Sequence, residues 1–196
     1  YDSSYGDWTG TKRYEVTTGM TPTAANAAQD LGELNMGLPK TLQDFVAWGV
    51  ARAPANKYAL VMWDHGGGWR SARTAGTKKA FKDVAWDDTS GGDALHTQEV
   101  RTALEAAGTH LDLLAFDACL MGMIEVAYEL KDRASVFVGA EQLVAGDGYP
   151  YTPILNDLVA TPPMTPAQLG TAIVDRFGVS VSGPGGTLAA INSSQL

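Results

Sequence analysis

Two side chains in this sequence, His65 and the single cysteine, Cys119, have the types and surroundings that a thiol nucleophile and its base require. The apolar run at residues 58–63 stops at Asp64-His65 and is followed by three glycines. A second apolar run, residues 111–116, stops at Asp117-Ala118-Cys119. Short apolar runs bounded by polar residues and turns predict buried strands. Each candidate therefore follows the end of a strand.

The predicted strands place His65 and Cys119 at the same edge of a sheet. In an open parallel sheet, functional groups collect at the carboxyl ends of the strands. Neighbouring or next-neighbouring strands lie roughly 5 to 10 Å apart. We therefore expect the two side chains to reach a shared cleft.

Cys119 also precedes a predicted helix at residues 121–131. The positive end of a helix dipole favours the reactive thiolate. The alternative is a buried, inert cysteine that acts as a small hydrophobic residue. The position after a strand and before a helix favours the reactive interpretation.

The three glycines after His65 distinguish it from the other histidines. Glycines let a backbone approach a ligand closely and expose N–H groups, as an oxyanion hole requires. His96 has no glycine loop, and His110 lies at the amino end of its strand, the opposite edge of the sheet. His65 could also be a structural histidine bonded to backbone in a tight turn, but the glycines argue against that role.

Two other chemistries fit less well. The string His-Gly-Gly-Gly also occurs in the oxyanion loops of lipases and esterases, but those enzymes need a Gly-x-Ser-x-Gly elbow, and the sequence has none. A metal site made of His65, Cys119 and nearby Asp residues lacks the ligand pairs at helical spacing that preorganise such sites.

The pattern of elements predicts an α/β fold, a three-layer α/β/α sandwich with a mostly parallel sheet. Near-continuous apolar strands fit a sheet that is covered on both faces. Thr41 is expected to cap the first helix, and Thr165 has a capping-box pattern with Pro166. Residues 66–96 lack periodicity, and a loop of that length is often functional. The expected helices are 41–52, 97–107, 121–131 and about 166–177, and the expected strands are 11–17, 58–63, 111–116, 135–140 and 188–191.

Composition narrows the function classes. A chain of 196 residues fits a single domain, residues 1–196, with a sizeable core. The net charge of −8 argues against nucleic acid or an anionic membrane as the main partner. No apolar run approaches the roughly 18 residues of a membrane span. One cysteine allows no internal disulfide.

The two strand ends together resemble the clostripain family of cysteine peptidases. The strings are Trp-Asp-His-Gly-Gly-Gly-Trp at 63–69 and the segment 116–130, which begins Phe-Asp-Ala-Cys-Leu-Met-Gly-Met. Segments 31–48, 87–100 and 145–155 support the resemblance, which covers most of residues 8–160. The family belongs with caspases, legumains and gingipains, which share the α/β/α sandwich and a His-Cys dyad.

The resemblance implies a role for each site residue. Cys119 would be the nucleophile and His65 the base or proton donor, with the backbone N–H groups of Gly66 and Cys119 forming the oxyanion hole. The family generally cuts after Arg or Lys, so Asp117 and Asp147 would line the S1 pocket. A buried cation needs such an anionic partner. The alternatives are a strand-end carboxylate for Asp117 and an ordinary turn carboxylate for Asp147.

The resemblance also predicts self-cleavage, because many relatives are activated by a cut between the histidine and the cysteine. We expect the cut after Lys79, before Ala80, in the loop at 66–96. The alternative is a solvated basic loop with no processing role. The loop holds several basic residues: Arg70, Arg73, Lys78, Lys79 and Lys82.

Cofactors and location follow from the resemblance alone. Some family members use calcium and others do not, so no cofactor is required and a calcium site is allowed. The candidate oxygen ligands, which lack a recognised calcium-loop pattern, are Asp83, Asp87, Asp88 and Asp93. A secreted or periplasmic location is expected more than a cytoplasmic one.

Family members normally begin with a further strand and helix, so we expect this chain to be shortened at both ends. Two other functions stay open. One is a non-catalytic binding module with a caspase-like fold, and the other is a different cysteine-dependent acyl-transfer enzyme.

Overall fold

The computed structural model of the protein describes residues 8–69, 83–181 and 186–196. The chain forms two compact units, Tyr1–Asn35 and Met36–Leu196. In the smaller unit, β1 (Thr11–Arg13) pairs antiparallel with β2 (Gln29–Gly32), and a short 3-10 helix, η1 (Ala24–Asn26), lies between them. Lys12 forms an ion pair with Asp30 across these strands. The strand expected at 11–17 is therefore present but shorter.

The larger unit is built on a four-stranded sheet. The strand order is β3 (Ala59–Trp63), β6 (Leu111–Asp117), β7 (Ala134–Gly139) and β8 (Ala189–Asn192). The first three strands are parallel and β8 is antiparallel to β7. The prediction of a mostly parallel sheet is confirmed.

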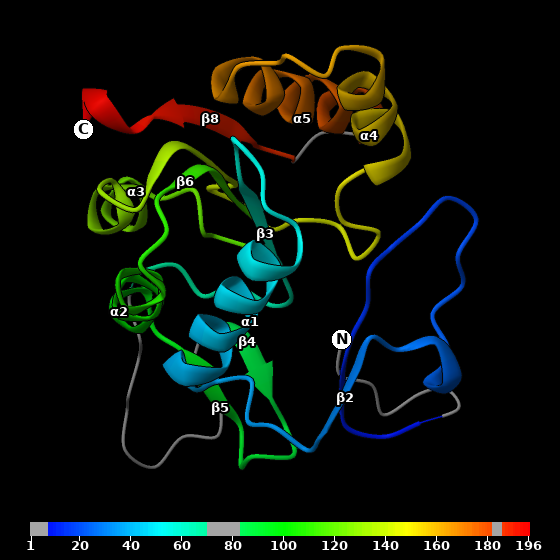
Figure 1. Ribbon diagram of the computed structural model, residues 1–196. Helices are drawn as coiled ribbons and strands as arrows, with labels where there is room; N and C mark the ends of the chain where they lie inside the picture. The colour runs from blue at the N-terminus through cyan, green and yellow to red at the C-terminus, as the bar shows by residue number, and fades with distance from the viewer. Residues whose placement is uncertain (1–7, 70–82, 182–185) are drawn as a thin grey trace. The chain divides into compact units, whose positions relative to one another are not determined.

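Helices cover both faces of this sheet, so the three-layer prediction is also confirmed (Figure 1). Alternate residues of β6 enter different cores. Leu114 and Phe116 pack with the first three helices, while Leu113 and Ala115 pack with the last two. The first group is α1 (Pro39–Arg52), α2 (Thr97–Ala107) and α3 (Ile124–Leu130); the second is α4 (Tyr151–Ala160) and α5 (Pro166–Ser180), and the chain ends in η2 (Ser193–Gln195).

Helix starts follow the sequence signals in one case and not in another. At α5, the Thr165 hydroxyl accepts the Gln168 N–H at 3.2 Å, and the Gln168 side chain accepts the Thr165 N–H at 2.8 Å. The capping box is therefore confirmed. At α1 the expected cap, Thr41, is wrong: the helix begins at Pro39 with Leu38 at the N-cap. Proline at the first helical position sets the backbone angle and needs no N–H partner.

The expectation of an unstructured segment at 66–96 is wrong in part. Two short strands, β4 (Val84–Asp87) and β5 (Asp93–Leu95), form an antiparallel hairpin. Val84 and Leu95 are buried in the core beside α2. Strands of three or four residues are too short to show a periodic pattern, and tertiary packing of these two apolar side chains stabilises the hairpin.

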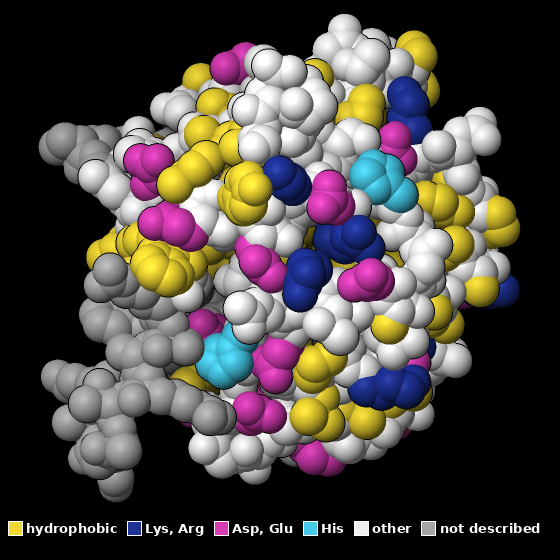
Figure 2. Space-filling model, turned by 90° about the vertical axis from the view of Figure 1, so that its left-hand side faces the viewer, with side chains coloured by type: hydrophobic (Ala, Val, Ile, Leu, Met, Phe, Trp, Pro, Cys, Tyr) yellow, Lys and Arg dark blue, Asp and Glu magenta, His cyan; other side chains and the backbone are white. Residues whose placement is uncertain are grey.

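The distribution of charged side chains on the surface is consistent with the net charge of −8. On the face shown in Figure 2, Lys and Arg side chains are interspersed with Asp and Glu side chains and form no continuous basic patch among the described residues. Among the same residues, none of the helices has the length and apolar character needed to cross a membrane.

Candidate functional site

The ends of β3 and β6 bring His65 and Cys119 to neighbouring positions. In the parallel pairing of these strands, Trp63 lies opposite Asp117. His65 and Cys119 each follow two residues later. A β-carbon built on Gly66 would lie 2.1 Å from the carbonyl oxygen of Cys119 and 3.0 Å from its backbone nitrogen. The two strand ends are therefore in backbone contact, and only glycine allows that approach.

Cys119 is half-buried and is framed by the segment after β7. Its sulfur accepts the backbone N–H of Val144 at 3.2 Å. On the same segment, the carbonyl of Gln142 accepts the N–H of Leu120 at 3.1 Å, and the carbonyl of Ala140 accepts the N–H of Gly122 at 2.7 Å. These bonds fix the turn that carries the thiol.

The backbone is strained immediately after the thiol. Leu120 has φ +62, in the left-handed region that a side chain disfavours by roughly 1–2 kcal/mol. Strained backbone conformations of this kind are common at functional sites, where the surrounding contacts maintain them. Leu120 is therefore a second indication, independent of sequence pattern, that this turn has a functional role.

The predicted helix at 121–131 begins later than expected. Residues 119–122 form a turn and α3 starts at Ile124, so Cys119 does not lie in the first turn of the helix. The delay has a packing reason: Gly122 lies against Gly139, where a β-carbon would be 2.5 Å from the Gly139 carbonyl. The donor near the thiol is the N–H of Val144, not the end of the helix.

His65 is held through its neighbours. Its own side chain is exposed and has no hydrogen-bond partner within the described part of the chain. On one side, Asp64 accepts the backbone N–H of Trp86 in the hairpin. On the other, Gly66 packs on Cys119. The backbone of His65 is thus held through both of its neighbours.

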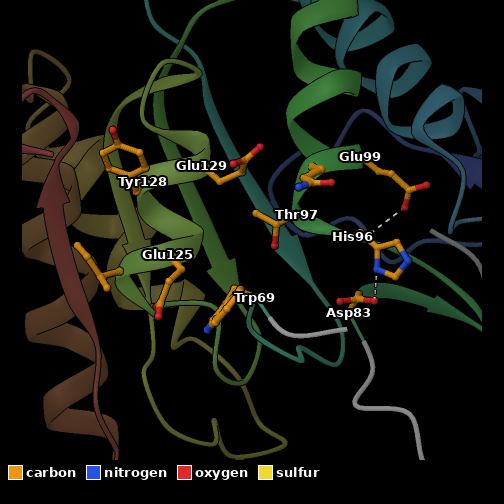
Figure 3. Close-up of a pocket in the computed structure, with 10 residues that line it drawn as sticks. Trp69, Asp83, His96, Thr97, Glu99, Glu125, Tyr128 and Glu129 are labelled. Atoms are coloured by element: carbon orange, nitrogen blue, oxygen red, sulfur yellow. Dashed lines mark hydrogen bonds and ion pairs between the residues drawn. The ribbon is translucent and has the colours of Figure 1, made fainter. Parts of the chain in front are cut away.

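The other two histidines have partners elsewhere. His96 is the N-cap of α2 and forms an ion pair with Asp83, as Figure 3 shows. Burial raises the pKa of Asp83 above its ordinary value, although the charge of His96 opposes that rise. His110 lies 3.1 Å from the Ser135 hydroxyl, where β6 begins. Of the three histidines, His65 is the one placed beside Cys119.

Asp117, the last residue of β6, is 2% exposed. Its Oδ2 accepts the backbone N–H of Tyr149 at 2.9 Å and the Tyr151 hydroxyl at 2.8 Å. Its Oδ1 is buried and has no hydrogen-bond partner among the described residues. Leaving a buried acceptor unpaired costs about 1–3 kcal/mol, and more when it is charged. An unpaired buried carboxylate oxygen is suited to receive a cationic group.

The loop that carries Asp147 lies against Asp117. Asp147 itself is exposed. The next residue, Gly148, has φ +65, and a β-carbon there would be 2.5 Å from the Asp117 Oδ2. The structure therefore brings the loop that carries Asp147 against Asp117, and the role of both residues in an S1 pocket stays a prediction.

Sequence reasoning missed the residues that organise Asp117. Tyr149 and Tyr151 lie in segment 145–155, and two tyrosines directly after an acidic turn are the signal that points to them. Burial and the nearby charge of Asp117 raise the pKa of Tyr149 above its ordinary value. Its hydroxyl donates to the Phe116 carbonyl at 2.7 Å, which ties the loop to β6.

Two further predictions receive no support from the geometry. Lys79 and Ala80, the expected cleavage point, lie outside the described residues. The carboxylates considered for calcium have other partners: Asp83 pairs with His96, and Asp88 accepts the Trp86 indole N–H at 2.6 Å. Within the described chain, no three His, Cys, Asp or Glu side chains converge to hold a metal ion. Calcium binding stays a prediction.

Asp87 shows what this acidic group does instead. Its carboxylate accepts the backbone N–H groups of Met36 and Ser90, at 2.8 and 2.9 Å, and the Thr89 hydroxyl at 2.6 Å. Burial opposes ionisation, but these hydrogen bonds outweigh it and hold the pKa of Asp87 below its ordinary value. The carboxylate stabilises the turn of the hairpin.

A cavity of about 760 Å³ lies between the starts of α2 and α3 (Figure 3). Its lining includes Trp69, Thr97, Glu125 and Tyr128. His65, Asp117 and Cys119 do not line it. The cavity is therefore lined by residues other than the three proposed for the strand-end site.

Comparison with known proteins identifies the relatives of this chain. The sequence profile of the clostripain family, peptidase family C11, matches residues 21–196. Clostripain from Hathewaya histolytica is 35% identical over 138 residues, which are 65% of this chain and 26% of that protein. The chain thus spans about a quarter of that relative.

Solved structures share the fold. A secreted C11 cysteine protease from Bacteroides thetaiotaomicron, in complex with an irreversible peptide inhibitor, has a TM-score of 0.67 at 24% identity. The match covers 87% of this chain and 49% of that one. An inactive zymogen C11 protease from Parabacteroides distasonis gives a TM-score of 0.68 at 23% identity, over 87% of this chain and 44% of that one. With the profile match over nine-tenths of its length, the chain belongs to the clostripain family.

Proposed function

We propose that this chain is part of a cysteine endopeptidase that hydrolyses peptide or protein substrates after Arg or Lys. The observation that carries the proposal is the register of the two strand ends. It leaves His65 and Cys119 each two residues beyond a paired position, with Gly66 against the Cys119 backbone. Family membership supports the same reaction class.

In the proposed reaction, the Cys119 thiolate attacks the carbonyl carbon of the scissile bond. The backbone N–H groups of Gly66 and Cys119 stabilise the oxyanion of the tetrahedral intermediate. The C–N bond then breaks, and His65 gives a proton to the leaving amine. Water hydrolyses the remaining thioester, which releases the acid product and returns the thiol.

Asp117 and Asp147 are the proposed S1 residues. The buried Asp117 Oδ1 would accept an N–H group of the basic P1 side chain, which matches its lack of a partner in the described chain. Asp147, exposed on the adjoining loop, would add negative charge at the pocket mouth. Pairing a buried carboxylate with a cation avoids the cost of leaving either one unpaired.

Activation by self-cleavage is part of the proposal. A bond after Lys79 would be a tethered substrate at high effective concentration, if S1 takes a basic residue. Incubation of the full-length protein, followed by sequencing of new N-termini, should give fragments that start at Ala80. These fragments should be absent in Cys119→Ala. A fully active protein that stays uncut would remove self-cleavage from the proposal.

The location is proposed by analogy. A Bacteroides relative with the same fold is described as secreted, and we place the full protein in the secreted or periplasmic class. Fractionation of the source cells would test this placement.

The decisive experiment uses the full-length protein, with peptides that carry Arg, Lys or Leu at P1 and an acyl-transfer probe that carries Lys. We expect hydrolysis of the basic peptides and covalent labelling of Cys119, both lost in Cys119→Ala. Labelling without hydrolysis would favour a different acyl-transfer enzyme. If the protein is neither labelled nor able to hydrolyse the peptides, a non-catalytic binding module is favoured.

A further inference from the structure

The two oxygens of the Asp117 carboxylate differ in their hydrogen bonding. Oδ2 receives both hydrogen bonds, one from the Tyr149 backbone N–H at 2.9 Å and one from the Tyr151 hydroxyl at 2.8 Å. Oδ1 is buried and receives none in the described part of the chain. A carboxylate oxygen offers about two acceptor positions. Both acceptor positions of Oδ2 are therefore occupied, and Oδ1 is the oxygen that can still accept a hydrogen bond from a ligand.

Three features keep the Tyr151 hydroxyl hydrogen-bonded to the Asp117 Oδ2. It is the first residue of α4, and its ring lies beside that of Tyr149, with the centroids 6.2 Å apart, although the residue is 39% exposed. Burial and the hydrogen bond to Asp117 raise the pKa of Tyr151 above its ordinary value, so the hydroxyl remains a donor at working pH. Gly148 packs against the same carboxylate and leaves it little room to turn.

We propose that Tyr151 is a positioning residue that limits Asp117 to a one-oxygen contact with the P1 cation and so weakens the selection of Arg relative to Lys. The inference rests on the proposed function, because it assumes that Asp117 binds a basic P1 side chain. A guanidinium binds most strongly when it donates two parallel N–H bonds to both carboxylate oxygens. An ammonium is a compact charge that needs only one oxygen.

The test is Tyr151→Phe in the full-length protein, which keeps the ring and removes only the hydroxyl. Matched peptides that differ only in Arg or Lys at P1 give the ratio of kcat/KM for the two substrates. We expect the Arg-to-Lys ratio to rise about tenfold, the scale of one added charge-assisted hydrogen bond. The change should come mainly through KM for Arg.

Two tyrosine variants serve as controls. Tyr149→Phe removes the hydrogen bond to the Phe116 carbonyl but keeps the N–H on Oδ2. It should lower activity on both substrates alike and leave the ratio unchanged. Tyr128→Phe, at an exposed position on α3, should change neither activity nor ratio. A third variant, Tyr151→His, tests rescue: it restores an N–H donor and should return the ratio toward the wild-type value.

The outcomes separate this inference from the proposed function. If the wild-type protein shows no preference for basic over neutral P1, the proposed function fails and Asp117 binds no P1 cation. If the wild type prefers basic P1 but the ratio in Tyr151→Phe stays within twofold of wild type, or falls, the proposed function stands and the role of Tyr151 is refuted. Thermal melting of each variant shows whether a lost activity is a lost fold.

Discussion

The end of β6 and the end of β3 are held in different ways. At the end of β6, Asp117 is buried and accepts two hydrogen bonds. The Cys119 sulfur accepts a third from the backbone N–H of Val144. Beyond the end of β3, His65 is exposed, and its imidazole has no hydrogen-bond partner within the described residues. One strand end has its side chains fixed, whereas the other has only its backbone fixed.

The difference suits the two roles that we propose. A nucleophile and its specificity carboxylate must keep one geometry through the reaction, because a small misplacement lowers the rate severely. A proton donor must face the thiol in one step and the leaving amine in another. A fixed thiol beside an exposed imidazole suits both requirements.

The largest effect should come from removing the imidazole. His65→Ala should lower kcat/KM by about 10²–10⁴-fold, the usual contribution of general acid–base catalysis. The melting temperature should stay unchanged, because the side chain is exposed. His110→Ala, at the other edge of the sheet, should keep full activity. Equal activity of both variants would remove His65 from the mechanism.

A second change should break the contact between the strand ends. Gly66→Ala would place a β-carbon 2.1 Å from the Cys119 carbonyl oxygen, so one backbone must shift. We expect a loss of about 1–3 kcal/mol in the free energy of unfolding, as for other overpacked sites. Activity should fall by roughly 100-fold, the scale expected for a misplaced site. Denaturant melts and peptide hydrolysis measure the two effects.

Gly178→Ala is the control for this variant, because a β-carbon at that position of α5 meets no atom within 4 Å. It should keep activity and gain a little stability, since alanine favours a helix over glycine. If Gly66→Ala behaves like Gly178→Ala, the two strand ends do not depend on their close contact.

A smaller effect is expected when Gly148, rather than Gly146, of the Asp147 loop is replaced by alanine. Gly148→Ala would put a β-carbon 2.5 Å from the Asp117 Oδ2 at φ +65, while Gly146→Ala meets nothing within 4 Å. We expect KM for basic peptides to rise about tenfold in Gly148→Ala, the equivalent of about 1.4 kcal/mol, and to stay constant in Gly146→Ala. Equal KM values would mean that Asp117 is not the group that the loop positions.

The smallest effect concerns the hairpin that steadies β3 through Asp64. The pKa of Asp87 is lowered in the folded protein, so its carboxylate stabilises the fold above the unfolded pKa of about 3.9. That contribution is lost as the pH falls through the folded value. Asp87→Asn should therefore cost about 1–2 kcal/mol of unfolding free energy at pH 7, within the range for hydrogen bonds to a charged group.

Urea melts of wild type and Asp87→Asn between pH 7 and pH 3 measure this effect. The gap between the two proteins should narrow as the pH falls toward 3. Asp88→Asn, at the exposed neighbour, is the control and should show little change at any pH. A gap that stays constant with pH would mean that the charge of Asp87 is not what holds the hairpin.

The sequence alone determined the elements that have strong local signals. The helix predicted at 97–107 has the same bounds in the structure, and the strand predicted at 111–116 extends by one residue to Asp117. Both strand ends, with His65 and Cys119, could be placed from apolar runs and the residues that stop them. Such signals lie within a few residues of each other and need no partner from elsewhere in the chain.

Only the tertiary structure decided the surroundings of the site. The Tyr151 hydroxyl reaches Asp117 across 34 residues of sequence, and Val144 reaches Cys119 across 25. The later start of α3 depends on Gly122 against Gly139, and the existence of β4 and β5 depends on buried Val84 and Leu95. Even α4, which begins after Pro150 and carries Pro153, showed no clear local start. Contacts between distant segments decide such features, because a packed core overrides weak local preferences.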